Sequence, residues 1–580
     1  MVNQEIARIF NEIADLLEIK GDNPFRIRAY RRAAQNIDGL PKDVAHLSEK
    51  ELIEIPGIGQ DLAGKIERYI STGKIEGYED LKKEVPEGLA VLLTVPGLGP
   101  KTAQLLSSKL HIKDIAELEA LAREHRLSGL PGIKDKTEEN ILKGIEMIKR
   151  GKERLPLGRV LPVANELLSL LREKAPLQGL ALAGSLRRWK ETIKDIDILA
   201  TSGEPEKAMN AFVHLPMVKD VLMKGPTKSS VLITEGIQVD LRVVERESFG
   251  AALAYFTGSK EHNIRLREMA VKAGLKINEY GIFRESDNKR LGGEKEEDVY
   301  RLLGLPYIPP ELREDRGEIE AALKGTLPRL LEIEDIMGDL HVHTKRSDGS
   351  HSLDELIKAA RDRGYKYIAV TDHTKGLGIA RGLNEEKILE EIEEIKAVNK
   401  KLRGFRLLTG AEVDIRSDYT LDLPDEVLKQ LDFVAASVHS GFRQSREQIT
   451  KRLVSAIRNP FVSVIAHPTG RLIGERDAYE VDLEGVFREA KDAGKAIEIN
   501  AYPLRLDIND VYAKKAKEMG IPIAISTDTH VLNQFDFMEY GVSIGRRGWL
   551  EKSDVINTMG TENLLKWLKK ARSAGGHRRS

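Results

Sequence analysis

Beyond Gly338 the sequence alternates short apolar runs with helical segments, and this alternation restricts the fold more than any other feature. Repeated strand and helix units form a parallel sheet with helices packed outside, which predicts a β/α barrel over residues 338–575. Several of the apolar runs end in polar motifs, namely YIAVTDH, LLTGAEVDI, FVAASVH, VSVIAHP and IAISTDTH. Because the C-terminal ends of barrel strands converge on one mouth, we expect the side chains at these ends to meet there.

These strand ends, together with the segment DLHVHTKRSDG, supply a large set of metal-binding side chains. They are His341, His343, Asp348, His373, Glu412, His439, His467, Asp528 and His530. A single histidine at a strand end is ordinarily a packed or surface residue, but its repetition favours a metal centre. The set is too large for one ion and fits two or three Zn²⁺, Mn²⁺ or Fe ions.

The first part of the chain is expected to be helical, with one short turn motif repeated. Gly57 and Gly59 form one Pro-Gly-x-Gly copy, Gly97 and Gly99 form a second, and residues 131–134 resemble a third that lacks the second glycine. Such a turn between helices exposes backbone N–H groups at a helix N-terminus, where they suit a DNA phosphate without reading its sequence. A tight helix–helix turn is the alternative, and the two good copies favour DNA binding.

Between these two regions, predicted strands carry three carboxylates. Asp195 and Asp197 lie two apart in one strand and so share a face, and Asp240 lies in another strand. Three such groups on adjacent strands can bind two Mg²⁺ or Mn²⁺ ions that assist transfer of a nucleotide to a 3′-hydroxyl. Gly184 and Ser185 begin a predicted helix that suits phosphate. The pattern is typical of nucleotidyltransferases, including those that modify tRNA or antibiotics.

The segment YFTGSKEHNIRLREMAVKAGLKINEYGIF, with GSLRRWKETIKDID and VDLRVV before it, resembles the family X DNA polymerases over residues 1 to about 315. The resemblance implies that Asp195, Asp197 and Asp240 bind the catalytic metals and that Ser185 and Arg188 bind the triphosphate. It implies gapped or nicked DNA and dNTPs as substrates. A non-DNA nucleotidyltransferase is opposed by the hairpins and by YFTGS.

The same resemblance gives the thumb residues their roles. Tyr255 and Phe256 sense the sugar and the primer end, Gly258 lies close to the sugar, Asn263 contacts the base edge and Arg267 reaches the template strand. Core packing is the alternative for the aromatic pair. The chain departs from the animal members at Lys260, which stands in place of an aspartate. A cation there could bind nucleotide before template pairing.

Lys65 occupies the position of the family's Schiff-base lysine, which removes a 5′-deoxyribose phosphate. A basic stretch, NPFRIRAYRRAA, precedes it and suits a 5′-phosphate. However, Asp61 replaces a second lysine, and its charge would stabilise the ammonium form of Lys65. A lyase and a simple contact to the DNA backbone are therefore both left open.

The last region resembles the PHP (polymerase and histidinol phosphatase) family over residues 338 to about 570, through HVHT, SDG, TDH, GAEVD, SVH, AHP and TDTH. The resemblance implies a metal-dependent phosphoesterase. Arg381, Arg443 and Arg471 are candidate substrate contacts, and an ordinary surface arginine is the alternative for each. Beside a polymerase the expected substrate is a DNA 3′ end, giving 3′→5′ exonuclease activity, with 3′-phosphatase or abasic-site endonuclease activity as additions. The alternatives are a metal-stabilised scaffold without turnover and a histidinol-phosphate-type phosphatase.

The full expectation is a multidomain chain whose parts differ in fold class. An all-α helix-hairpin-helix region comprises residues 1–85 and 86–154, an α+β nucleotidyltransferase comprises a palm at 155–242 and a thumb at 243–315, and a linker at 316–337 leads to the distorted β/α barrel. The 580 residues carry a net charge of -1 and no cysteine, which excludes disulfides and thiolate zinc sites. The first residues lack the basic start and apolar run of a signal peptide, and no apolar stretch is long enough to span a bilayer, so we expect a cytoplasmic protein without membrane contact. The expected oligomeric state is a monomer.

Overall fold

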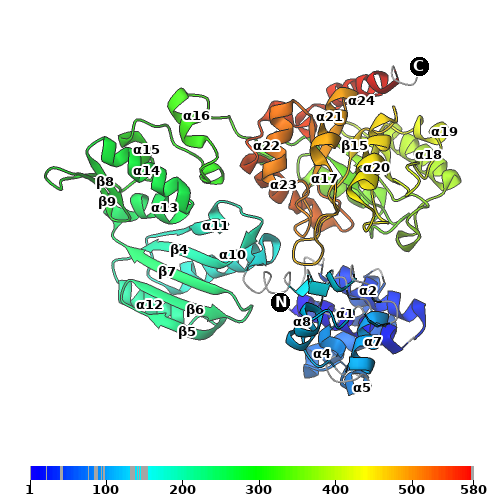
Figure 1. Ribbon diagram of the computed structural model, residues 1–580, viewed down its shortest axis with the longest axis horizontal. Helices are drawn as coiled ribbons and strands as arrows, with labels where there is room; N and C mark the ends of the chain where they lie inside the picture. Colours follow the sequence, from blue (N-terminus) through cyan, green and yellow to red (C-terminus); the bar gives the residue numbers. More distant parts are fainter. Residues whose placement is uncertain are drawn as a thin grey trace.

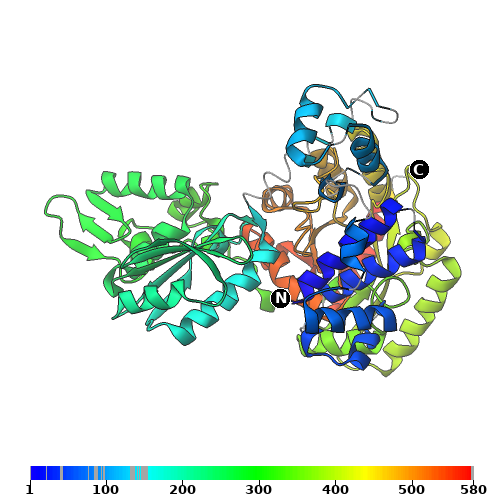
Figure 2. The same cartoon turned by 90° about the horizontal axis from the view of Figure 1, so that it is seen from below.

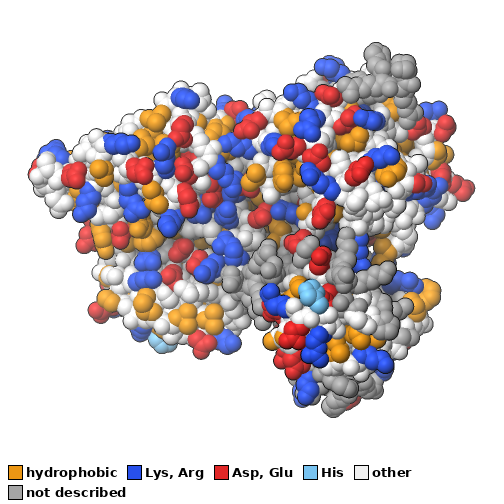
Figure 3. Space-filling view, in the orientation of Figure 1, with side chains coloured by type: hydrophobic (Ala, Val, Ile, Leu, Met, Phe, Trp, Pro, Cys, Tyr) orange, Lys and Arg blue, Asp and Glu red, His pale blue; other side chains and the backbone are white. Residues whose placement is uncertain are grey.

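The computed structural model describes all residues except 1, 21, 39–43, 56, 76, 84–88, 93, 94, 96, 97, 99, 111, 128, 131, 132, 134–136, 140, 143, 146–153 and 577–580. Figure 1 shows one lobe that holds the palm and thumb, and beside it the C-terminal barrel with the N-terminal helices beneath. Figure 2, seen from below, again places the N-terminal helices against the barrel and away from the thumb. Acidic and basic side chains are interspersed over the face in Figure 3.

The N-terminal region is helical, as predicted. Its described elements are α1 (Val2–Lys20), α2 (Pro24–Asp38), η1 (Val44–His46), α3 (Glu49–Glu54), α4 (Gln60–Thr72), α5 (Tyr78–Lys83), α6 (Leu89–Leu92), α7 (Pro100–Leu110) and α8 (Ile115–Arg123). In α1 the apolar residues Ile6, Phe10, Ile13 and Leu17 recur every three or four positions and are all buried. They pack with residues of the other helices into one core.

The palm is a five-stranded sheet in the order β2-β4-β7-β6-β5. Its strands are β2 (Gly179–Leu182), β4 (Asp195–Thr201), β5 (Val218–Lys224), β6 (Lys228–Ile233) and β7 (Gln238–Val244), and its helices are α10 (Leu157–Lys174), α11 (Gly184–Arg187) and α12 (Pro205–Val213). A short pair, β1 (Leu155–Pro156) and β3 (Thr192–Ile193), lies beside it. The central strands β4 and β7 run parallel, so their polar ends lie at the same edge.

The thumb combines helices with a three-stranded sheet in the order β10-β9-β8. Its elements are η2 (Arg246–Ser248), α13 (Phe249–Thr257), α14 (Lys260–Lys272), β8 (Leu275–Asn278), β9 (Gly281–Arg284), β10 (Arg290–Gly292), α15 (Glu297–Leu302) and η3 (Pro310–Leu312). The connection to the barrel contains α16 (Glu318–Lys324) and η4 (Ile333–Asp335).

The C-terminal domain is a seven-stranded parallel sheet in simple sequence order. Its strands are β11 (Gly338–Val342), β12 (Tyr367–Val370), β13 (Arg406–Asp414), β14 (Phe433–Ser437), β15 (Val464–Ile465), β16 (Ala496–Asn500) and β17 (Ile523–Ser526). A parallel bridge between Val342 and Thr529 brings the last strand back to the first. The strands are buried, which is why they lack polar alternation and show as apolar runs.

Helices surround this sheet. They are α17 (Leu353–Asp362), α18 (Glu385–Lys401), α19 (Asp425–Leu428), α20 (Arg446–Arg458), α21 (Leu483–Ala493), α22 (Asp510–Met519), α23 (Met538–Arg547) and α24 (Thr561–Gly576), with the short turns η5 (Gly378–Ala380), η6 (Leu532–Phe537), η7 (Lys552–Asp554) and η8 (Ile556–Thr558). The order of helical, α+β and barrel parts confirms the predicted fold class. Among the described residues, no helix is long and apolar enough to cross a membrane.

The palm and the barrel share one apolar core, which the sequence did not indicate. Buried residues from α10 and the palm sheet belong to the same cluster as those of the barrel strands. Trp189 of the palm packs edge-on against Tyr540 of α23, with ring centroids 6.1 Å apart. Gly158 of α10 lies so close to Pro503 that an added Cβ would be 2.2 Å from the proline Cβ.

Candidate active sites

The three palm carboxylates lie side by side. In the parallel register of β4 and β7, Asp197 is opposite Asp240, and Asp195 is two residues before Asp197 on the same face. Burial, and then the charges of Asp195 and Asp240, raise the pKa of Asp197 to about 6. Such repulsion among carboxylates is what bound divalent cations would relieve, so the donor set fits a metal site.

Asp240 has partners that the sequence did not single out. Gln238 Nε2 donates to its Oδ1 at 2.8 Å, and Lys228 Nζ from β6 lies 3.3 Å from its Oδ2. Burial alone would raise the pKa of Asp240, but hydrogen bonds from Gln238 and Ser230 and the charge of Lys228 lower it. The alternation of the IQVD strand could have indicated Gln238, whereas Lys228 requires knowledge of the strand pairing.

The predicted phosphate-binding turn adjoins these carboxylates. α11 begins at Gly184, which has a left-handed backbone with φ +63°. A Cβ at Gly184 would lie 2.3 Å from Oδ2 of Asp197, so only glycine leaves room for that carboxylate. Ser185 follows and is half-buried.

The two arginines that follow, Arg187 and Arg188, have different partners. Arg187 is bidentate to Glu296 through Nη1 at 2.6 Å and Nη2 at 2.7 Å, so its guanidinium is committed to the thumb. Arg188 donates through Nε to Glu314 at 2.9 Å and through Nη1 to the carbonyl oxygen of Thr257 at 2.7 Å. Arg188 is therefore also connected to the thumb, through Nε and Nη1.

The thumb residues lie around the end of α13 and the start of α14. Tyr255 and Phe256 pack edge-to-face at 5.1 Å, and Asn263 Nδ2 donates to the carbonyl oxygen of Tyr255 at 2.7 Å. A Cβ at Gly258 would lie 2.5 Å from Asn263 Oδ1, which explains the glycine. Lys260 is the first residue of α14.

Both Lys260 and Arg267, further along α14, are exposed. Their side chains are therefore open to solvent on the helix that carries Asn263.

The first hairpin joins α3 to α4. Gly57 has φ +85° and Gly59 is the N-cap of α4 without a side-chain cap, so the backbone N–H groups of the first turn of α4 have no capping side chain. Lys65 Nζ lies 2.5 Å from Asp61 Oδ1, one helical turn earlier. Gly97, Gly99 and most of the third copy lie outside the described residues.

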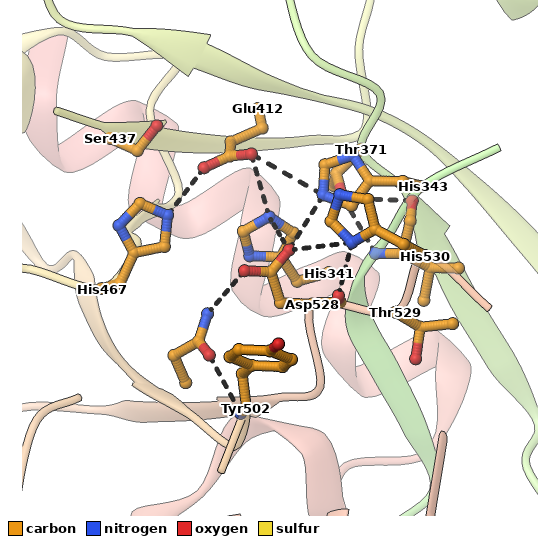
Figure 4. A network of polar contacts seen from close by, with 12 residues as sticks. His341, His343, Thr371, Glu412, Ser437, His467, Tyr502, Asp528, Thr529 and His530 are labelled. Atoms are coloured by element: carbon orange, nitrogen blue, oxygen red, sulfur yellow. Dashed lines mark hydrogen bonds and ion pairs between the residues drawn. The ribbon is translucent and has the colours of Figure 1, made fainter. Parts of the chain in front are cut away.

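All nine predicted metal ligands of the barrel converge at one mouth. Figure 4 shows His341, His343, Glu412, His467, Asp528 and His530 among them. Glu412 is central: His467 Nε2 lies 2.8 Å from its Oε1, and His373 Nδ1 lies 2.9 Å from its Oε2. One group of potential ligands is His343, Asp348, His373 and His530, a second is His341, His343 and Asp528, and a third is His373, Glu412 and His439. The three groups share members, which is the arrangement of a multinuclear centre.

The burial of this cluster tests whether it fits metal ions. In the described part of the chain, buried ring nitrogens of His341, His343, His373 and His467 and Oε2 of Glu412 have no hydrogen-bond partner. Unsatisfied buried polar atoms that point at one another are costly unless a cation lies between them. The residues therefore fit bound metal ions.

The pKa values of two histidines in the cluster are shifted in opposite directions. Burial, followed by the charges of His530 and His373, lowers the pKa of His343 to about 4. Burial alone would lower the pKa of His439, but Glu412 and Asp414 raise it to about 9. Such opposed shifts within a few ångströms are characteristic of functional sites.

Two residues behind the ligands escaped the sequence prediction. Glu498 accepts from His341 Nδ1 at 2.8 Å and from the backbone N–H of His467 at 2.7 Å. Asn500 donates through Nδ2 to Asp528 Oδ2 at 3.1 Å. Glu498 fixes which nitrogen of His341 faces the metal site. A glutamate inside the apolar strand AIEIN was the feature that could have revealed it.

Among the candidate substrate arginines, Arg471 connects the barrel to the palm, because its Nη2 donates to Glu191 of the palm at 2.8 Å. Arg381 and Arg443 are exposed.

Comparisons with known proteins agree with this arrangement. Family descriptions match in chain order: a helix-hairpin-helix domain at residues 1–75, a SAM-like helix-hairpin-helix tandem at 89–146, a DNA polymerase beta thumb at 252–314 and a PHP domain at 339–502. The DNA polymerase/3′-5′ exonuclease PolX of Bacillus subtilis is 39% identical over 573 residues, 98% of this chain and 100% of that protein. The chain belongs to the family X DNA polymerases that carry a C-terminal PHP domain.

The barrel alone has further relatives. A probable phosphatase of Thermoanaerobacter sp. (strain X514) is 34% identical over 251 residues, 41% of this chain and 97% of that protein. A probable phosphatase of Acetivibrio thermocellus is 33% identical over 203 residues, 33% of this chain and 79% of that protein. This family X polymerase therefore joins a polymerase half to a barrel that also occurs in shorter proteins.

Proposed function

We propose that this protein is a DNA repair polymerase that fills short gaps, and that its PHP domain trims DNA 3′ ends as a 3′→5′ exonuclease. The observation that carries the proposal is the parallel register that sets Asp197 opposite Asp240 beside the Gly184 turn, in a chain that aligns end to end with PolX of B. subtilis. We propose gapped or nicked DNA and dNTPs as its substrates and a monomer as its working form.

In the polymerase half, Asp195, Asp197 and Asp240 would bind Mg²⁺ or Mn²⁺. These ions would assist loss of the 3′-hydroxyl proton and neutralise the triphosphate. Backbone N–H groups of the Gly184 turn, Ser185 Oγ and Arg188 orient the phosphates. Tyr255, Phe256, Gly258 and Asn263 border the sugar and base, and Arg267 faces the template.

In the PHP half, the nine ligands would bind two or three Zn²⁺, Mn²⁺ or Fe ions. The ions would activate a water and bind the phosphate oxygens of the 3′ end. Glu498 orients His341, and Asn500 orients Asp528. The presence of all nine ligands opposes a scaffold without turnover. The similarity to probable phosphatases supports 3′-phosphatase activity as a second reaction of the same centre. Abasic-site cleavage is a further reaction that this centre could perform.

The experiment that tests the two-site function uses a gapped duplex labelled near its 3′ end, incubated with Mn²⁺ with and without dNTPs. Extension should disappear in Asp240→Ala and persist in His341→Ala. Degradation should show the reverse. Loss of both activities in both variants would contradict two independent centres.

A further inference from the structure

The guanidinium of Arg188 is directed by Glu314, which lies at the end of the thumb. Arg188 Nε donates to Glu314 Oε1 at 2.9 Å, and the two side chains are only 12% and 10% exposed. A buried ion pair with additional hydrogen bonds has a defined geometry, because few other partners or water molecules can replace it. The direction of Arg188 therefore depends on the position of Glu314.

Glu314 is in turn held by a side chain of the PHP domain. Arg547, the last residue of α23, is 2% exposed and donates through Nη1 to Glu314 Oε1 at 3.0 Å. The same Nη1 also donates to the backbone carbonyl oxygen of Arg188. One guanidinium of the PHP domain thus contacts both the carboxylate that directs Arg188 and the backbone of Arg188.

Arg547 has an anchor of its own. Its Nη2 donates to Oδ2 of Asp510, the first residue of α22, at 2.6 Å. Asp510 also accepts from Arg316 of the linker at 2.9 Å. The chain of contacts from Asp510 through Arg547 and Glu314 to Arg188 crosses the boundary between the two halves. Removing one member would leave buried charges without partners, and the others would rearrange.

The neighbouring Arg187 shows that this support is specific. Its carboxylate partner, Glu296, is held instead by Arg313 at 2.6 Å, and both belong to the thumb. No contact with the barrel enters that network among the described residues. Of the two arginines after the Gly-Ser turn, only Arg188 is connected to the barrel through its carboxylate partner.

We propose that Arg547 is a positioning residue for nucleotide binding, because it holds Glu314 and the backbone of Arg188 so that the Arg188 guanidinium meets the triphosphate. This inference rests on the proposed function, which takes Arg188 as a triphosphate ligand. It makes the nucleotide affinity of the polymerase depend on a PHP side chain that touches neither substrate.

The test measures single-nucleotide extension of gapped DNA by the full chain, with separate values of KM for dNTP, kcat and Kd for DNA. Arg547→Met should raise KM for dNTP about ten-fold, a usual size for coupling between sites. We expect kcat to change less and Kd for DNA to stay the same. A general loss of structure would instead lower kcat and the active fraction.

The matched control is Arg546→Met, one residue earlier in α23. Arg546 also joins the barrel to the thumb and linker, through Glu311 at 2.8 Å and Glu332 at 2.7 Å, but it does not contact Arg188 or Glu314. Its KM for dNTP should remain that of the wild type. An equal rise in both variants would overturn the positioning role, because any weakened interface would then suffice.

Glu314→Gln is the second variant, since it keeps the shape of the side chain and removes its charge. Glu314→Gln should also raise KM for dNTP, as Arg547→Met does. If Arg547→Met loses PHP nuclease activity through misfolding, the result for Glu314→Gln alone tests the positioning role. Unchanged KM in Glu314→Gln would overturn the inference. Asp240→Ala separates this failure from that of the proposed polymerase site, because extension that survived in Asp240→Ala would contradict the polymerase site itself.

Discussion

Asp197 of β4 lies directly opposite Asp240 of β7, and this pairing concentrates negative charge in a half-buried place. Burial and the two neighbouring carboxylates raise the pKa of Asp197 to about 6 from an ordinary value of 3.8. Between these two values the folded chain binds more protons than the unfolded chain, so stability falls as pH rises from about 4 to about 6.

A divalent cation should reverse this loss. We expect Mg²⁺ to raise the melting temperature of the wild type more at about pH 7.5 than at about pH 5.5, since protons compete with the metal at the lower pH. In Asp197→Asn the difference between the two pH values should shrink, because the titrating group is gone. Thermal-shift measurements with and without Mg²⁺ give both numbers, and equal behaviour of the two proteins would contradict the assignment.

Gly184→Ala should disable extension without affecting the nuclease. The new Cβ would meet Oδ2 of Asp197 at 2.3 Å, and the left-handed backbone of Gly184 adds strain. A displacement of about 1 Å at a catalytic group can cost about a hundredfold in rate. Gly203→Ala is the control, since its Cβ would meet only Gln178 Nε2 at 3.7 Å. Primer-extension and exonuclease rates of both variants decide, and normal extension by Gly184→Ala would be the contrary result.

The ion pair between Lys65 and Asp61 bears on the lyase. If Lys65 forms a Schiff base, borohydride should trap the wild type on abasic DNA, the adduct should vanish in Lys65→Ala, and it should increase in Asp61→Ala, which releases the amine from its carboxylate. Gel analysis of the trapped complex measures all three. An absence of adduct in both the wild type and Asp61→Ala would leave Lys65 as a contact to the DNA backbone.

Lys260 begins α14 beside the proposed nucleotide site and is exposed. We expect Lys260→Ala to weaken binding of dGTP in the absence of DNA by about three- to tenfold, the effect of losing one partly exposed charge contact. Lys272→Ala, at the other end of the same helix, should bind dGTP like the wild type. Equilibrium titration with dGTP and Mg²⁺ tests both, and unchanged affinity in Lys260→Ala would exclude the role.

Glu498→Gln should weaken the metal centre of the barrel. Glu498 accepts from His341 Nδ1, and loss of such a partner typically lowers metal affinity by about 10–100-fold. Metal content after dialysis against a chelator should fall, and exonuclease activity should require more added Mn²⁺, while extension is kept. Glu489→Gln, on the outer helix α21, is the control. Full metal retention in Glu498→Gln would contradict the role.

The fold class could be predicted from the sequence because apolar residues recur with a different spacing in the helical, α+β and barrel parts. The strand predicted around Asp240 is β7 (Gln238–Val244), and the buried barrel strands were visible as apolar runs. The nine metal ligands could be found because each lies near the C-terminal end of a barrel strand or in the loop that follows it.

The contacts that could not be predicted from the sequence join residues that are far apart along the chain. Lys228 reaches Asp240 only because β6 lies next to β7, and Arg547 reaches Glu314 across the two halves of the chain. Arg187 and Arg188 are adjacent in sequence but bind different carboxylates, because Glu296 and Glu314 lie in different places. The periodicity of apolar residues indicates which face of a helix or strand a residue occupies. It does not indicate which residue, far away in the sequence, lies next to it in the fold.

The close approach of Gly158 to Pro503 has a consequence for how such proteins can change over evolutionary time. A larger residue at position 158 would be harmless in a free-standing palm and damaging here, so the two positions must vary together. Recombination that exchanged one half for that of a distant relative would bring together surfaces that had not adapted to each other. The polymerase and the nuclease are therefore expected to share one lineage, inherited as a single piece.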